Sequence, residues 1–68
     1  MTRMRVNGVE QEVAATTVAE LLVEHDVDPG ARFLAIAVNG NVVHRADWAS
    51  RELSPGDVVE IVRPLQGG

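Results

Sequence analysis

Two Asn-Gly dipeptides, Asn7-Gly8 and Asn39-Gly40, are the features that most constrain how this chain folds. Both residues of such a pair adopt positive φ readily, so Asn-Gly between strand-like segments favours a tight hairpin turn. Segments 3–6 and 9–13 flank the first dipeptide and predict a two-stranded hairpin. The second dipeptide predicts a turn that leads into a further short strand, which begins with Val42-Val43.

A short helix is predicted after the hairpin. Thr17 and Glu20 have the spacing of a capping box, in which the Thr17 side chain accepts from the Glu20 amide and Glu20 reaches back to the Thr17 amide. An apolar stripe with helical spacing follows at Val18, Leu21, Leu22 and His25. We expect the helix to end near Asp26, because Pro29 restricts the residue before it to extended conformations. So short a helix must pack on another element.

The C-terminal half predicts strands and turns. Residues 34–38 alternate large and small side chains, which places Leu34, Ile36 and Val38 on one face of a strand. Residues 46–49 have room for one turn of helix, and 54–57 form a strong turn signal. The last strand is expected over residues 58–63.

This order of elements predicts an α+β fold in which one mixed sheet of about four to five strands carries one helix across one face. It is the order of the ubiquitin-like β-grasp. We expect Val59 and Ile61 to face the helix, and Val58 and Val62 to lie on the open face. Residues 1–63 would form this domain, and residues 64–68 a flexible C-terminal tail that ends in Gly-Gly.

Composition argues against several classes of function. The net charge of −4 disfavours nucleic-acid binding. No apolar run approaches the roughly 18 residues of a membrane span, and no signal peptide is recognisable, so we expect a cytoplasmic protein. The absence of cysteine and the separation of His25 from His44 argue against a metal site. The carboxylates form no catalytic pair, Asp57 is interpreted as a turn residue, and Trp48 is expected in the core.

The tail after the last strand is chemically suggestive. Residues 64–68 could span roughly 15–18 Å when extended, which is enough to enter a partner protein. A free carboxylate on Gly68 is anionic at neutral pH and must be activated before it can react as an acyl group. If this cysteine-free chain carries sulfur, that terminus is the only plausible place for it. The plain alternative is a frayed glycine end.

Three patterns in the second half resemble the thiamine sulfur-carrier family known as ThiS. They are A-V-N at residues 37–39, V-x-R-x-x-W at 43–48, and L-x-x-G-D-x-V-E-I-V at 53–62. The terminal Gly67-Gly68 and the T-V-A-E-L-L opening of the helix fit as well. The likeness covers essentially the whole chain, and the R-x-x-W element favours the thiamine branch over the molybdopterin branch.

The resemblance implies a carrier that is not itself an enzyme. A ubiquitin-activator-like adenylyltransferase of the ThiF type would use ATP to adenylate Gly68, and the carrier itself would bind no cofactor. A sulfur donor, such as a cysteine desulfurase system, would then form a thiocarboxylate for a thiazole synthase of the ThiG type. Partner contacts are expected along the tail and the open face, at Val58, Val62, Pro64, Leu65, Gln66 and Gly67.

Two other interpretations remain open. The chain could be the sulfur carrier and small subunit of molybdopterin synthase, or a non-catalytic β-grasp binding module with an inert tail.

Overall fold

A computed structural model describes residues 1–63 of the chain; the predicted tail, 64–68, lies outside the described residues. Within these 63 residues, five strands, one α-helix and one 3₁₀ turn follow one another. They are β1 (Thr2–Val6), β2 (Val9–Val13), α1 (Val18–Glu24), β3 (Ala35–Val38), β4 (Asn41–Val43), the 3₁₀ turn Arg45–Asp47 and β5 (Val58–Val62).

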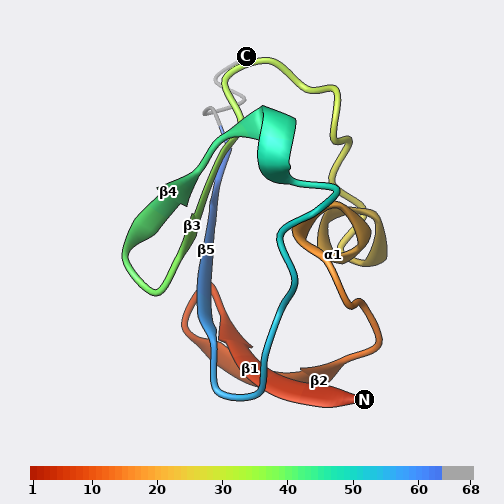
Figure 1. Cartoon of the computed structure of the whole chain (residues 1–68), viewed down its shortest axis with the longest axis vertical. Helices are drawn as coiled ribbons and strands as arrows, with labels where there is room; N and C mark the ends of the chain where they lie inside the picture. Colours follow the sequence, from red (N-terminus) through yellow and green to blue (C-terminus); the bar gives the residue numbers. More distant parts are fainter. Residues whose placement is uncertain (64–68) are drawn as a thin grey trace.

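The five strands form one mixed sheet in the order β2-β1-β5-β3-β4. Strands β1 and β5 run parallel, and the other neighbours are antiparallel. Helix α1 packs across one face, so the molecule has two layers (Figure 1). The predicted α+β fold with the β-grasp order of elements is therefore confirmed, with the last strand of the chain at the centre of the sheet.

Both Asn-Gly turns are formed as predicted. Asn7 and Gly8 have φ values of 52° and 82°, and Asn39 and Gly40 have 53° and 83°. These positive angles match the right-handed twist of the flanking strands, which is why the two-residue turns close tightly. The hairpin register pairs Val6 with Val9 across the first turn.

The two turn asparagines also bind the central strand, which the sequence did not predict. Asn7 Oδ1 accepts from the Ile61 amide at 2.7 Å, and Asn39 Oδ1 accepts from the Val58 amide at 2.9 Å. Strand β1 turns away at Asn7, so it cannot offer a backbone carbonyl to Ile61. The side-chain amide oxygens thus continue the pairing of β5 beyond the neighbouring strands.

Helix α1 begins as predicted, with one change in the capping box. Thr17 Oγ1 accepts from the Glu20 amide at 3.2 Å. Glu20 Oε1, however, accepts chiefly from the amide and the hydroxyl of Thr16, each at 2.8 Å, and the Thr17 amide that was expected contributes less. These hydrogen bonds, led by the one from the Thr16 amide, lower the pKa of the Glu20 carboxyl below 4.5.

The helix ends at Glu24, with His25 as the C-cap, slightly before the expected Asp26. The cause is also different from the one predicted. Asp26 has a positive φ of 58°, its amide donates to Val23 O, and the Val27 amide donates to Leu22 O. This is a Schellman motif, in which aspartate occupies the place that glycine usually takes. The helix therefore stops through its own cap before Pro29 has any effect.

The core lies between α1 and the inner face of the sheet. As predicted, Val59 and Ile61 of β5 are buried there. Trp48 is also in the core, with 4% of its surface exposed. The buried set further includes Met4, Val6, Val13, Val18, Leu21, Leu22, Leu34, Ile36 and Val38. In the described part of the chain, no helix has the length and apolar character needed to cross a membrane.

We expect glycine at the two turn asparagines to separate the backbone role from the side-chain role. Glycine keeps the positive φ but removes the amide. Asn7→Gly should cost about 1–2 kcal/mol of unfolding free energy through the lost bond to Ile61. Asn39→Gly should cost more, since buried Asp57 also loses a donor. Urea unfolding measures both. Asn41→Gly controls for the added glycine, and wild-type stability in Asn7→Gly would contradict the assignment.

The Glu20 carboxyl should make stability depend on pH. Its pKa is lowered in the folded state, so its contribution is present above the ordinary value of 4.5 and is lost as pH falls through the folded value. We expect wild type to melt higher than Glu20→Gln at neutral pH, and the difference to disappear in acid. Thermal unfolding at a series of pH values measures this. A constant difference across that range would contradict it.

Candidate functional site

The site residues predicted from the sequence fall into two groups, one on β5 and one in the tail that follows it. Pro64, Leu65, Gln66, Gly67 and Gly68 lie outside the described residues. Val58 and Val62 lie within them, on the strand that leads into the tail. At the end of this strand Val62 pairs with Ala35, the first residue of β3, and the loop before β3 lies at the same end of the molecule (Figure 1).

Val58 and Val62 both point to the open face of the sheet, as expected. Their exposed fractions are 41% and 58%, and exposed Glu60 lies between them on the strand. Neighbouring strands add small or apolar side chains on the same face. We call this surface the open-face patch, and it consists of Ala35, Ala37, Val42, Val58 and Val62. An apolar surface next to charged groups is suited to protein docking.

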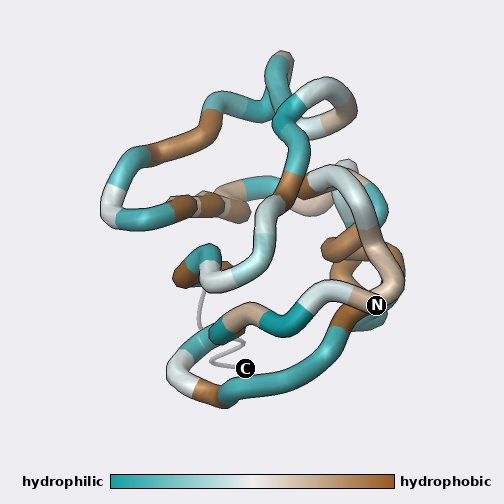
Figure 2. Tube along the Cα trace, turned by 60° about the horizontal axis from the view of Figure 1, so that its bottom comes forward, coloured by the Kyte–Doolittle hydropathy of each residue, from teal (hydrophilic) through white to brown (hydrophobic). Residues whose placement is uncertain are grey.

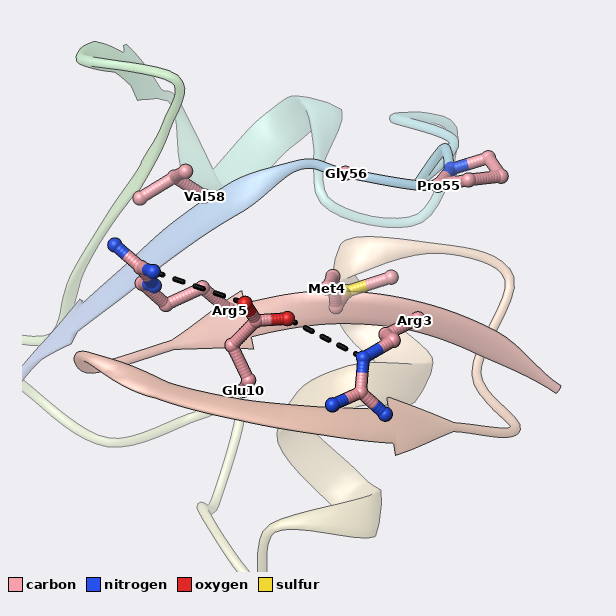
Figure 3. Close-up of a pocket in the computed structure, with 7 residues that line it drawn as sticks. All are labelled: Arg3, Met4, Arg5, Glu10, Pro55, Gly56 and Val58. Atoms are coloured by element: carbon pink, nitrogen blue, oxygen red, sulfur yellow. Dashed lines mark hydrogen bonds and ion pairs between the residues drawn. The ribbon is translucent and has the colours of Figure 1, made fainter.

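A shallow hollow of about 410 Å³ continues the open face toward the hairpin. At the edge of this hollow, the Glu10 carboxylate lies between Arg3 and Arg5 (Figure 3). Its Oε1 is 3.3 Å from Arg3 Nε, and its Oε2 is 3.8 Å from Arg5 Nη2. The hairpin carries a hydrophilic stretch along its second strand (Figure 2). These ion pairs are exposed and contribute little stability. The hollow was not predicted, although the hairpin register already places Arg5 opposite Glu10.

The ionisable residues weighed from the sequence have structural roles. Asp57 is buried and accepts from the Ser54 amide at 2.8 Å and from Asn39 Nδ2 at 3.0 Å, which confirms it as a turn residue. His25 is half-buried and bridges Leu21 O and Gln11 Oε1 at 3.2 and 2.9 Å. Among residues 1–63, no group of three histidine or carboxylate side chains could hold a metal ion.

The R-x-x-W element clamps the loop before β3. The Arg45 guanidinium lies 4.5 Å from the centroid of the Trp48 ring and donates to the carbonyls of Pro29 and Ala31. Trp48 is fixed in turn, because its Nε1 donates to Val43 O at 2.8 Å. A pattern recognised in the sequence as a family signature therefore holds a loop against the end of the sheet.

Phe33 was not singled out by sequence reasoning. Its side chain is 80% exposed and its φ is 61°. The alternation of Leu34, Ile36 and Val38 toward the core already placed Phe33 on the outside, so its exposure could have been predicted. Its left-handed backbone could not, because aromatic residues rarely adopt positive φ.

The described residues provide a patterned open face and a clamped loop beside the strand that leads to the C-terminus.

Comparison with known proteins shows the family of this chain. The sequence model described as "ThiS family" matches residues 4–68. No curated protein matches the chain significantly.

Two solved structures of one protein are similar over nearly the whole chain. The crystal structure of the thiamine biosynthesis protein ThiS from Geobacter metallireducens is 28% identical, with a TM-score of 0.80, and the match covers 98% of this chain and 100% of that one. The solution NMR structure of a thiamine biosynthesis protein from the same organism is also 28% identical, with a TM-score of 0.79. That match covers 98% of this chain and 88% of the other.

The clamp formed by Arg45 can be tested by a substitution that keeps its charge. Arg45→Lys removes the planar guanidinium that both stacks and donates to two carbonyls. We expect faster hydrogen exchange in residues 28–33 and a loss of about 1 kcal/mol in unfolding free energy. Arg51→Lys is the control, since within residues 1–63 the Arg51 side chain donates only to the adjacent Glu52 carbonyl. Unchanged exchange in the loop of Arg45→Lys would show that the clamp does not hold it.

Proposed function

The chain belongs to the ThiS family, and from this membership we propose that it is a sulfur carrier whose working group is the C-terminal carboxylate of Gly68. One observation carries the proposal: the family match extends over residues 4–68 and so includes the Gly-Gly end. The structural match to a thiamine biosynthesis protein supports the thiamine branch for this chain.

The chemistry begins with activation of the carboxylate. An oxygen of the Gly68 carboxylate attacks the α-phosphorus of ATP, pyrophosphate leaves, and an acyl-adenylate remains. An adenylyltransferase of the ThiF type performs this step and supplies the ATP site. The terminal sulfur of a persulfide on a donor, such as a cysteine desulfurase system, then displaces AMP and forms an acyl disulfide. A thiol attacks the donor's sulfur in that S–S bond, forms a new disulfide with the donor and releases the thiocarboxylate. A thiazole synthase of the ThiG type consumes that sulfur.

The chain itself contributes binding and presentation. It contains no cysteine that could hold sulfur, and all six of its basic residues are arginines, so it has no side-chain amine to compete for the activated acyl group. Glycine at the last two positions gives the tip no side chain that would hinder the approach of a nucleophile. The chain is therefore a co-substrate of its partners and not an enzyme.

The body is proposed to bind its partners through the open-face patch and the tail. Val58 and Val62 supply apolar contact next to Pro64, Leu65, Gln66 and Gly67 in the sequence. Burying these exposed valines against a partner would release ordered water and favour association. Docking along β5 would also direct the tail into the partner's active site.

Removal of Gly68 tests the proposal directly. The shortened chain should fold and melt like wild type, since the described fold ends before the tail, yet should accept no sulfur. Intact-protein mass spectrometry after incubation with the activating enzyme, ATP and a sulfur source measures the outcome. Wild type should gain the mass difference between sulfur and oxygen.

Deletion of Met1 is the matched control for shortening the chain, because Met1 is exposed at the other terminus. This variant should gain the same mass as wild type. Sulfur incorporation into the chain that lacks Gly68 would refute the assignment of the working group.

A further inference from the structure

Phe33 combines a strained backbone conformation with an exposed aromatic side chain. Its aromatic ring is 80% exposed, and its backbone lies in the left-handed region with φ of 61°. An L-residue with a bulky side chain is strained in this region, and residues with such strain are found more often at binding and active sites than elsewhere. Because the Phe33 side chain is exposed, no packing in the core compensates for this strain. Of the two aromatic residues in the chain, Trp48 is buried and Phe33 is exposed.

The contacts around Phe33 hold the loop backbone that carries the ring. Arg45 binds the carbonyls of Pro29 and Ala31, while the amides of Gly30 and Ala31 both donate to Asp28 within the same loop. Buried Leu34 anchors the other side of Phe33. A ring presented by a loop held in this way loses little conformational entropy on binding, which is the property of an interface anchor.

Phe33 also lies where any enzyme that reaches Gly68 must touch the body. It precedes Ala35 by two residues, and Ala35 pairs with Val62 at the end of β5. Five residues separate Arg63 from the end of the chain, and they span at most about 18 Å. An enzyme that encloses the terminal carboxylate therefore has to cover this end of the sheet, where the loop that carries Phe33 also lies.

Two arginines lie at this end of the molecule, Arg32 in the loop and Arg63 just after β5, and exposed Asp28 is the carboxylate of the same loop. Arg32 and Arg63 are exposed, and among residues 1–63 neither forms an ion pair. The chain as a whole carries a net charge of −4. Arginine side chains at the same end of the molecule as an exposed aromatic ring complement a partner surface that has an apolar pocket with negative charge nearby. Adenylation is the first proposed reaction of the Gly68 carboxylate, so the adenylating enzyme is the partner that has to recognise this end of the body before any other.

We propose that Phe33 is the anchor by which this carrier docks on its adenylating enzyme, with the ring in an apolar pocket beside the tail channel and with Arg32 and Arg63 facing negative charge. This proposal rests on the proposed function, because it takes the adenylating enzyme as the partner. It adds a second contact point away from the open-face patch, supplied by the loop and not by β5.

The test uses ATP–pyrophosphate exchange by the ThiF-type adenylyltransferase with the full chain as substrate. Phe33→Asn removes the ring and introduces a residue that tolerates positive φ. We expect its KM as substrate to rise about tenfold with kcat little changed, as for the loss of an interface anchor. Its melting temperature should equal or exceed that of wild type, because the backbone strain is relieved. Phe33→Leu keeps apolar bulk and should fall between the two in KM.

Val23→Asn is the matched control, since Val23 is 65% exposed on the outer side of α1 and should leave KM unchanged. A wild-type KM for Phe33→Asn would overturn the anchor. So would a rise in KM that comes with a lowered melting temperature, because Phe33 would then act through the fold. If the wild-type chain supports no exchange at all, the proposed function fails and the anchor with it, so wild type separates the two failures.

Discussion

The structure depends on placing the last strand of the chain at the centre of the sheet. Strand β5 pairs with β1 in parallel over only two residue pairs and with β3 over four. Its contact with β1 joins the two ends of the chain and carries a large loop-closure cost. The side chains of Asn7 and Asn39 extend this limited pairing by accepting from the amides of Ile61 and Val58. Each turn that reverses a hairpin thus also holds the strand that leads to the C-terminus.

Strand β5 contributes one face to the core and the other to the proposed docking surface. Val59 and Ile61 face α1 in the core, while Val58, Glu60 and Val62 lie on the open face. Because side chains alternate along a strand, a shift of one residue in register would exchange the two sets. The bonds from Asn7 and Asn39 oppose such a shift, since each accepts from one particular amide. The open face therefore presents its valines only as long as the central register is kept.

Local features of the fold could be predicted from the sequence, and non-local ones could not. The Asn-Gly turns, the Thr17 cap and the alternation in β3 and β5 depend on neighbouring residues, and the structure confirms them. The contacts of Asn7 with Ile61 and of Arg45 with Pro29 join distant segments, so spacing gives no sign of them. Asp26 and Phe33 depart from residue preference at positive φ, where glycine or asparagine would have been recognisable. In the candidate site, the outward orientation of Val58 and Val62 could be predicted, while the clamped loop 28–33 is recognisable only in the three-dimensional structure.

The short reach of the tail links the fold to the proposed function. A long flexible arm would let a carrier present its carboxylate from many orientations, with a low effective concentration at any one of them. Five residues beyond Arg63 permit few orientations, because they reach about 18 Å at most. The position of the carboxylate is then set mainly by how the body sits on the enzyme. That gives physical meaning to the clamp of Arg45 and Trp48. It fixes loop 28–33 at the end of the sheet where β5 leads into the tail, so that the surface which the proposed adenylating enzyme would recognise there has a defined shape.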